Sequence, residues 1–269
     1  MAFELDFHSL GNPDSSVSVA FVPWDTELFG IPVHELRFDE EYARLGGIVA
    51  QWLSDLDRRQ GCLVCAKVDE QAVPLLEILA NDGFYPVSTV LELESVLAKA
   101  IGVTLAPTVP AHLRRAVMAD LPAIGTIASS AFWSDRFHLD PNLSSEKASL
   151  RYVTWVESAF VAEEPVFVFE RDDTGDVVGF YHVRPLSEDK VDLTLGAIDP
   201  SLTGRGLGTA LFHSTMLACM DLGFEIAQTR IAARNLAVLN VFSRLQWSFC
   251  GTKTALHWYE APADGGRAL

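Results

Sequence analysis

Three glycines at alternate positions, Gly204, Gly206 and Gly208, form the part of this sequence whose spacing is best suited to binding a charged ligand. Glycine has no Cβ, so a segment that carries several of them can turn sharply and bring backbone N–H groups close to a phosphate. The residues that follow predict a helix over 209–222, whose first amides and positive dipole end would point at the same anion. The segment therefore predicts a phosphate-binding turn between a strand and a helix.

Two other phosphate-binding motifs do not fit this turn. A P-loop ends in Gly-Lys-Ser/Thr, whereas Gly208 is followed by Thr209 and Ala210. A dinucleotide-binding turn opens a βαβ unit near the start of a domain, with an acidic residue about 20 residues further on. This turn lies late in the chain, after strands that do not alternate with helices. A glycine-rich turn that binds no ligand remains as the structural alternative.

The turn and the strand before it resemble motif A of the GNAT superfamily of acyl-CoA N-acyltransferases. Ile198-Asp199-Pro200 supplies the apolar-x-Pro step at the strand end, and Thr203 stands where the family usually has Arg or Gln. The resemblance implies that acetyl-CoA, or another acyl-CoA, is the co-substrate, with its pyrophosphate on the loop amides. The residues implied to bind it are Ala197, Ile198, Thr203, Gly204, Arg205, Gly206, Leu207, Gly208, Thr209 and Asn235.

The elements that must position this turn follow the GNAT order. Periodicity and turn signals predict a strand and a helix within 115–128, a helix over 145–159, a hairpin of 166–170 and 177–183, and a strand over 190–198. After the helix of the glycine turn come a strand over 225–232, a helix over 237–245 and a strand over 252–259. The predicted fold class is α/β (α+β), a GNAT fold in which helices flank a mixed central sheet.

The first part of the chain ends, like the second, in a helix, a short turn and a strand. We predict that residues 1–100 form a degenerate, partial GNAT-like domain, with chance likeness as the alternative. No glycine-rich turn precedes its helix, so we expect no CoA site of its own. Residues 101–110, with Ala-Pro and Val-Pro steps, are predicted as a linker, 111–260 as the acyltransferase domain and 261–269 as a loose tail.

A second cluster with chemical potential is the segment that holds Arg136, His138 and two carboxylates between two predicted helices. Together with Trp24-Asp25 and the Tyr152-x-x-Trp155 pair, it resembles the TDP-fucosamine acetyltransferase branch of the superfamily. That resemblance implies an amine on a nucleotide-linked amino-deoxysugar as the acceptor, contacted by Arg136 and His138. A surface loop held by salt bridges is the alternative.

The groups that would assist the thioester are less clearly marked. Asn235 stands where the superfamily has an Asn near the pantetheine arm or the thioester, although Asn also caps helices well. The usual Tyr general acid aligns with Phe242, which has no proton to donate. Ser243, Asn240 or water are the substitutes, and the sequence does not choose among them. Loss of a general acid slows such chemistry by ~10² to 10⁴-fold without forbidding it.

The base that deprotonates an ammonium acceptor is also open. His182 titrates near neutrality and is the first candidate, with a hydrogen-bonded sheet histidine as the alternative. Tyr181 and Asp192 are candidates for acceptor contacts. Backbone N–H groups of residues 196–198 are expected to bind the thioester carbonyl as an oxyanion hole, with Gly196 marking a β-bulge.

Charge and composition exclude several classes of protein. The 269 residues are 49% hydrophobic, which is typical of a globular chain, and the formal net charge of −16 opposes nucleic acid and anionic membranes. The apolar runs are far shorter than the ~20 residues that span a bilayer, and the acidic first residues do not resemble a signal peptide. We therefore expect a cytoplasmic protein.

The remaining expectations concern partners. The four cysteines are too few and too scattered for a disulfide framework, and no metal site is predicted. The expected partner is a small-molecule amine, and the aromatic-rich N-terminal half is a candidate surface for a homodimer or for the other domain. A catalytically silent CoA-binding or partner-binding protein of the same fold is the alternative function.

Overall fold

The computed structural model describes residues 5–10, 17–39, 47–56, 58–102 and 110–263, and the chain divides into two compact units. Unit 1 contains the described residues of Leu91–Ser134 and Ser149–Gly251. Unit 2 contains those of Glu4–Val90, Asp135–Ala148 and Thr252–Leu269. Of the predicted linker and tail, residues 103–109 and 264–269 lie outside the described residues.

Unit 1 is built on a mixed sheet with the strand order β5-β10-β9-β8-β7-β6. Neighbouring strands from β6 to β9 are antiparallel, and β9 and β10 are parallel. The strands are β5 (Tyr85–Val96), β6 (Ala111–Arg115), β7 (Val166–Arg171), β8 (Val177–Pro185), β9 (Lys190–Ile198) and β10 (Ile226–Ala232).

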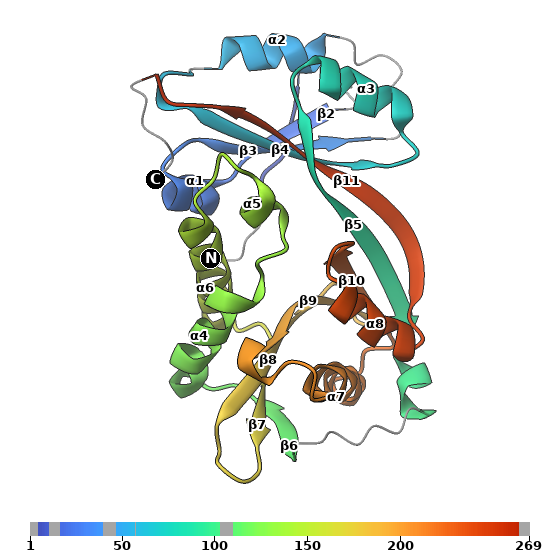
Figure 1. The fold of residues 1–269 in the computed structure, drawn as a ribbon. Helices are drawn as coiled ribbons and strands as arrows, with labels where there is room; N and C mark the ends of the chain where they lie inside the picture. Colours follow the sequence, from blue (N-terminus) through green and yellow to red (C-terminus); the bar gives the residue numbers. More distant parts are fainter. Residues whose placement is uncertain (1–4, 11–16, 40–46, 57, 103–109, 264–269) are drawn as a thin grey trace. The chain divides into compact units, whose positions relative to one another are not determined.

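Helices cover both faces of this sheet (Figure 1). One face packs against α4 (Leu121–Ala131) and α6 (Ser145–Val161), and the other against α7 (Leu207–Asp221) and α8 (Leu236–Arg244). Phe180 of β8 belongs to the first core and Tyr181 to the second, as the alternation of side chains along a strand requires. The short helices η3 (Leu97–Gly102), η4 (Met118–Asp120) and η5 (Pro200–Leu202) lie in the connections.

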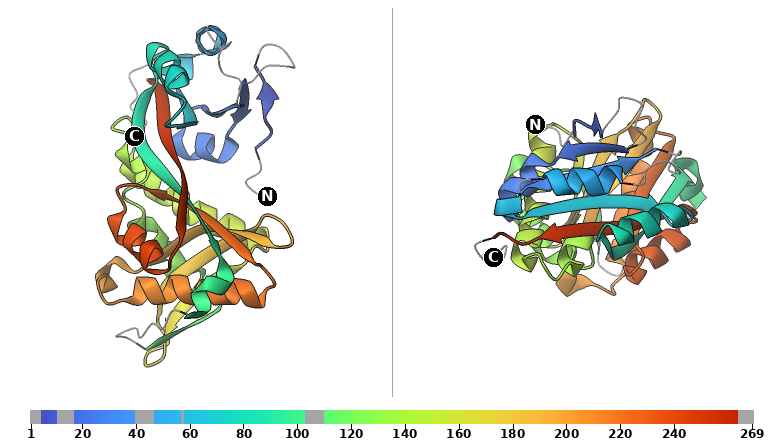
Figure 2. Two further views of the ribbon diagram at one scale, coloured as in Figure 1. Left: turned by 90° about the vertical axis from the view of Figure 1, so that its right-hand side faces the viewer. Right: turned by 90° about the horizontal axis from the view of Figure 1, so that it is seen from above.

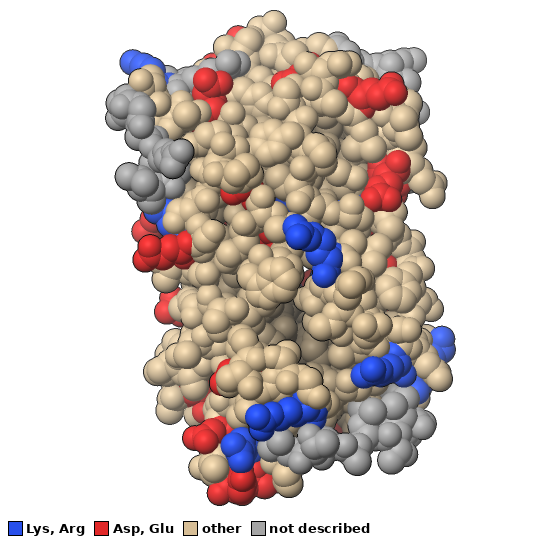
Figure 3. Space-filling view, in the orientation of Figure 1, with Lys and Arg blue, Asp and Glu red and all other residues tan. Residues whose placement is uncertain are grey.

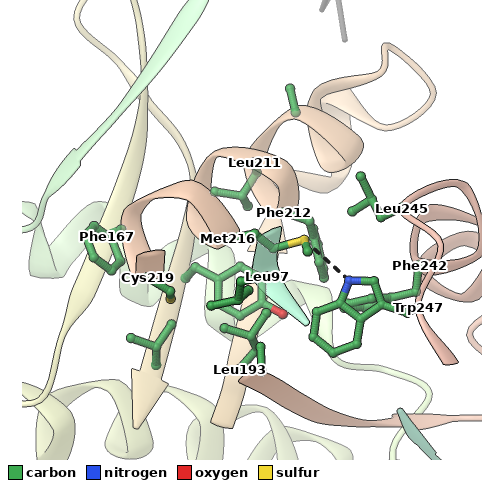
Figure 4. Close-up of a cluster of buried hydrophobic side chains, with 14 of the residues drawn as sticks. Leu97, Phe167, Leu193, Leu211, Phe212, Met216, Cys219, Phe242, Leu245 and Trp247 are labelled. Atoms are coloured by element: carbon green, nitrogen blue, oxygen red, sulfur yellow. Dashed lines mark hydrogen bonds between the residues drawn. The ribbon is translucent and has the colours of Figure 1, made fainter. Parts of the chain in front are cut away.

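The core beneath α7 is rich in aromatic side chains (Figure 4). Phe242 of α8 lies edge-on between Phe212 and Trp247, with ring centroids 4.9 and 4.7 Å away. The indole Nε1 of Trp247 donates to the Met216 sulfur at 3.4 Å, so the polar atom of this ring has a partner in the core. Such packing fixes α7 and α8 on the sheet, and through α7 it fixes the end of the glycine-rich turn that leads into this helix.

The strands of unit 2 follow the order β1-β2-β3-β4-β11, and β11 is hydrogen-bonded to β5, so that all eleven strands belong to one sheet. The strands of unit 2 are β1 (His8–Ser9), β2 (Val17–Phe21), β3 (Val33–Phe38), β4 (Cys62–Asp69) and β11 (Ser248–Glu260); β3 and β4 are parallel and the other pairs antiparallel. Figure 2 shows β11, in red, beside β4. One face packs against α2 (Ile48–Asp55) and α3 (Val73–Asn81), and the other against α1 (Pro23–Phe29) and α5 (Arg136–Leu139), while η2 (Arg58–Gln60) precedes β4.

The predicted class, a mixed sheet flanked by helices, is confirmed. The predicted elements are observed apart from their ends, whereas α5 and, in the first part of the chain, α1, α2 and β1–β3 were not predicted. The units divide the chain differently from the predicted ranges 1–100 and 111–260. The reason is that β5 passes from unit 2 into unit 1 at Leu91, β11 passes the other way at Thr252, and residues 135–148 pack within unit 2.

On the outside, the face shown in Figure 3 carries charged side chains in small groups among uncharged ones. In the described part of the chain, the helices are too short or too polar to cross a membrane.

The predicted bulge at Gly196 is wrong in its position. The register between β8 and β9 shifts where His182 and Val183 face Leu195 and Leu193, so the extra residue is Thr194. Gly196 instead faces Tyr181, and a Cβ at this position would lie 2.3 Å from the Tyr181 ring. Glycine is therefore required here by the close approach of an aromatic ring.

Replacing Gly196 with Ala is expected to lower the free energy of unfolding by about 1–3 kcal/mol, because the buried Tyr181 ring must move. The control is Gly125→Ala in α4, whose Cβ would meet Val153 Cγ1 at an ordinary 3.6 Å and whose helix favours Ala over Gly. Urea unfolding of both variants measures the difference, and equal stability of the two would contradict this account of Gly196.

Candidate active site

The pairing between β9 and β10 stops early. In these two strands, which are described in full, Lys190–Asp192 pair with Ile226–Gln228, and the register continues no further although β9 extends to Ile198. Where the strands part, the Thr229 hydroxyl donates to the Leu193 carbonyl at 2.7 Å. The edge of β9 beyond Leu193 is thus left without a neighbouring strand on that side.

Two backbone amides face this open edge. The Asp199 amide donates to the Val178 carbonyl of β8 at 2.9 Å, and amides of successive residues in an antiparallel strand point to opposite edges. Ala197 therefore faces β8, whereas the N–H groups of Gly196 and Ile198 point away from it. They are suitably oriented donors for a carbonyl oxygen on which negative charge develops.

The loop after β9 is shaped as an anion-binding turn. The Asp199 carboxylate accepts from the Ser201 amide at 2.9 Å, and Gly204 and Gly206 have φ of 82° and 78°, which favours glycine. The first intrahelical hydrogen bond of α7 runs from the Ala210 amide to the Gly206 carbonyl at 3.2 Å. The amides of residues 207–209 precede it and have no partner within the helix.

The space in front of this turn is open. A Cβ at Gly204, Gly206 or Gly208 would meet no atom within 4 Å, so no side chain of the described residues crowds the glycines. Residues 203–206 are exposed. Accessible amides at a helix N-terminus are the donor set that binds phosphate groups, so the turn fits a pyrophosphate.

Helix α8 follows β10, the strand that parts from β9. The Asn235 side chain accepts from the Val238 amide at 3.2 Å and so caps this helix. On the same helix Phe242 is 1% exposed, within the aromatic core, while Ser243 is exposed. The catalytic roles predicted for Asn235 and Ser243 stay predictions.

The predicted base lies in a partly buried cluster with Glu164 and Arg184. His182 is fully buried, and its Nε2 lies 2.6 Å from Glu164 Oε2. Arg184 donates from Nε to the other oxygen of Glu164 at 2.8 Å. Burial raises the pKa of the Glu164 carboxyl, but the hydrogen bonds from His182 and Arg184 outweigh this effect and lower that pKa to about 2. Glu164 is therefore a carboxylate at neutral pH.

Glu164 was not identified from the sequence. It lies 18 positions before His182, and no motif links the two. The sequence offers one sign that could have identified it: Glu164 is an acidic residue that precedes Pro165, where the predicted helix gives way to the predicted strand.

The two candidates for acceptor contacts lie in different surroundings. Tyr181 is buried against Phe212 in the core beneath α7, and burial raises the pKa of its hydroxyl well above the usual value. Asp192 lies at the last paired position of β9, 7% exposed, with its carboxylate 3.2 Å from Arg230 Nη1. Tyr181 and His182 are on opposite faces of the sheet.

Arg136 and His138 lie in unit 2, whereas the other predicted site residues lie in unit 1. The Arg136 guanidinium is buried and donates from Nη2 to Glu35 Oε2 at 2.9 Å. His138 Nδ1 lies 2.7 Å from Asp135 Oδ1. Both side chains thus have local partners in unit 2, and their contact with an acceptor stays a prediction.

Replacing Glu35 with Gln is expected to lower the free energy of unfolding by about 1–3 kcal/mol, because it removes the carboxylate that accepts from Arg136 Nη2, while the charge of Asp25 still acts on the buried guanidinium. The matched control is Asp173→Asn in the exposed Arg171–Asp173 pair, which should change stability much less. Chemical unfolding of both variants gives the measurement. A loss at Glu35 as small as that at Asp173 would show that the buried pair contributes little.

Comparison with known proteins finds similarity to one family in part of the chain. Residues 130–246 match the Acetyltransferase (GNAT) family. A stretch of 100 residues is 28% identical to the mycothiol acetyltransferase of Propionibacterium freudenreichii subsp. shermanii, and it covers 36% of this chain and 31% of that protein. The match therefore spans less than a third of the length of that relative.

Solved structures show the same fold at low sequence identity. A GCN5-related N-acetyltransferase from Sphaerobacter thermophilus has a TM-score of 0.66 at 14% identity, over 93% of this chain and 79% of that one. Another from Kribbella flavida has a TM-score of 0.62 at 15% identity, over 94% and 89%. A tandem GNAT protein from the clavulanic acid biosynthesis pathway has a TM-score of 0.62 at 14% identity, over 97% and 84%. The chain thus has the GNAT fold, and its residues 130–246 are similar to the Acetyltransferase (GNAT) family.

Proposed function

We propose that this protein is an acyl-CoA-dependent N-acyltransferase that transfers the acyl group, first of all acetyl, to the amine of a small acceptor. The observation that carries the proposal is the combination of an open β9 edge with an accessible glycine turn directly after it. An acyl-CoA has matching groups: a thioester carbonyl that needs hydrogen-bond donors and a pyrophosphate that needs amides.

The donor would be held mainly by backbone groups. The amides of Gly206 and of residues 207–209 would bind the pyrophosphate at the start of α7, where the helix dipole favours negative charge. The amides of Gly196 and Ile198 would bind the thioester carbonyl and stabilise the negative charge that develops on its oxygen. Arg205, in the loop, adds a positive charge to this region.

The transfer needs no covalent enzyme intermediate. The amine, after losing a proton to His182 or to water, would attack the thioester carbon, and the CoA thiolate would leave. Phe242 cannot protonate the thiolate, but a thiol has a pKa of about 8.5, so the thiolate leaves without help at an acceptable rate. Ser243, Asn240 or water would supply the proton afterwards.

For the acceptor we favour the amine of a nucleotide-linked amino-deoxysugar. The support is the resemblance of the Arg136-Phe137-His138 segment and of Trp24-Asp25 to the TDP-fucosamine acetyltransferase branch. The net charge of −16 favours the encounter with a free cationic amine, but it does not favour a nucleotide-linked one, because such an acceptor also carries an anionic pyrophosphate. A screen of nucleotide-linked amino sugars, free amino sugars and peptide amines would separate this acceptor from the others.

A catalytically silent CoA-binding protein is the second candidate. It is favoured by Phe242 at the position of the usual acid and by Thr203 in the loop. Both functions require acyl-CoA binding, and only the first requires release of CoA in the presence of an amine.

Calorimetric titration with acetyl-CoA, longer acyl-CoAs and free CoA tests the donor site. We expect micromolar binding of acetyl-CoA to the native protein. Replacing Gly206 with Asp should weaken binding about 100-fold or more, because like charges about 4 Å apart repel by about 4 kcal/mol at an effective dielectric constant of 20.

The matched control is Gly223→Asp, at the other end of α7. Gly223 also has positive φ and open space around it, so the substitution adds the same charge under the same backbone strain. Binding that is lost equally in both variants would point to unfolding, and binding unchanged in Gly206→Asp would exclude the glycine turn as the pyrophosphate site.

A further inference from the structure

We propose that Glu164 is a positioning residue that holds the proton of His182 on Nε2, so that Nδ1 is the atom that accepts the proton of the incoming amine. The inference rests on the proposed acyl transfer. It assigns a role to Glu164 and a tautomer to His182.

The hydrogen-bond geometry determines the tautomer. A neutral imidazole carries one N–H, and a carboxylate can only accept, so the 2.6 Å contact between His182 Nε2 and Glu164 Oε2 requires the hydrogen on Nε2. Nδ1 then presents a lone pair. It is buried and has no hydrogen-bond partner among the described residues.

This arrangement differs from that of a purely structural histidine. Buried polar atoms are nearly always hydrogen-bonded, and an orphaned one calls for an explanation. A carboxylate on one ring nitrogen and a free lone pair on the other is the arrangement by which a carboxylate orients a histidine base. Because a base acts directly or through one water, the amine need not touch Nδ1 itself.

The neighbouring charges keep this arrangement stable. Arg184 donates to both oxygens of Glu164, at 2.8 and 3.4 Å, and the pKa of Glu164 stays far below neutrality. Opposite Arg184 in the register is Asp192, whose own carboxylate pairs with Arg230. Three charged residues therefore lie around His182: Arg184 on β8, Glu164 after the end of α6, and Asp192 on β9.

The end of α6 aims Glu164 at the histidine. The Glu163 amide donates to the Phe160 carbonyl at 3.1 Å and the Glu164 amide to the Ala159 carbonyl at 3.0 Å, the two bonds of a Schellman motif. This motif needs a residue with positive φ, and Glu163, with φ of 57°, occupies the place where glycine is usual. The turn leads directly into β7, where Val166 faces His182.

His182 is one strand away from the proposed oxyanion hole. In the register it faces Leu195 of β9, whose next residue, Gly196, directs its amide to the open edge. Facing residues in an antiparallel pair have Cα atoms about 5 Å apart. Because Nδ1 is buried, a proton from an amine that attacks a thioester held by the Gly196 amide would reach it through one water.

The tautomer is tested first, by ¹⁵N NMR of the native protein with labelled histidine, the His182 signals being assigned by comparison with His182→Gln. At pH 8 we expect Nε2 to be protonated and Nδ1 unprotonated. A spectrum with the hydrogen on Nδ1, or rapid exchange between both tautomers, would overturn the proposal.

The role is tested by the pH dependence of kcat/KM. Glu164→Ala should lower kcat/KM about 10- to 100-fold and shift the ascending limb of the profile to lower pH, because the carboxylate no longer stabilises the protonated imidazole. Glu164→Gln can still accept from Nε2 through its amide oxygen, so it should keep the tautomer and restore part of the rate, with the limb still shifted. The matched control, Glu163→Gln, removes the same charge one residue away from an exposed side chain and should leave rate and profile unchanged.

Different results would overturn the proposed acyl transfer and the proposed role of Glu164. Absence of acetyl-CoA binding would overturn the proposed function and with it the role of Nδ1 as proton acceptor, while the bond from Nε2 to Glu164 would still be decided by the NMR spectrum. Acyl transfer with the expected tautomer but an unchanged profile in folded Glu164→Ala would leave the proposed function intact and overturn the role of Glu164.

Discussion

The chemistry available to unit 1 depends on one interrupted hydrogen-bond ladder. β9 and β10 pair only over Lys190–Asp192 and Ile226–Gln228, and then separate. A continuous parallel ladder would use the amides of Gly196 and Ile198 within the sheet, and no donors would remain for a ligand. The Thr229 hydroxyl satisfies the Leu193 carbonyl where the strands part, so the interruption does not leave that carbonyl without a partner.

Local signals allowed the sequence to predict the strand and the turn that lie at the open end of this ladder. The strand over 190–198 and the glycine turn after it are recognisable because periodicity and glycine spacing are properties of neighbouring residues. The sequence analysis places a bulge at Gly196, whereas glycine is needed there because the Tyr181 ring of the adjacent strand lies against it. Neighbouring residues in the sequence carry no sign of this contact. The bulge itself, at Thr194, carries no distinctive residue.

The candidate base shows the same limit. His182 could be proposed from its residue type, but Glu164, which orients it, depends on a Schellman turn whose positive-φ position holds Glu163 and not glycine. Likewise the predicted ranges kept residues 135–148 with the acyltransferase domain, whereas they pack within unit 2, where Arg136 pairs with Glu35. Sequence periodicity does not report ion pairs between residues a hundred positions apart.

Phe242 shows how packing restricts the chemistry. Its ring lies within 5 Å of the Phe212 and Trp247 ring centroids, and the one polar hydrogen of Trp247 is already donated to Met216. A hydroxyl on this ring would lie in an apolar core, where an unsatisfied donor costs about 1–3 kcal/mol. The core therefore favours Phe over Tyr at this position. In the mechanism proposed above, the assistance that unit 1 gives to the thioester would then come from the amides of β9, which stabilise the charge on the carbonyl oxygen, and the CoA thiolate would leave unprotonated.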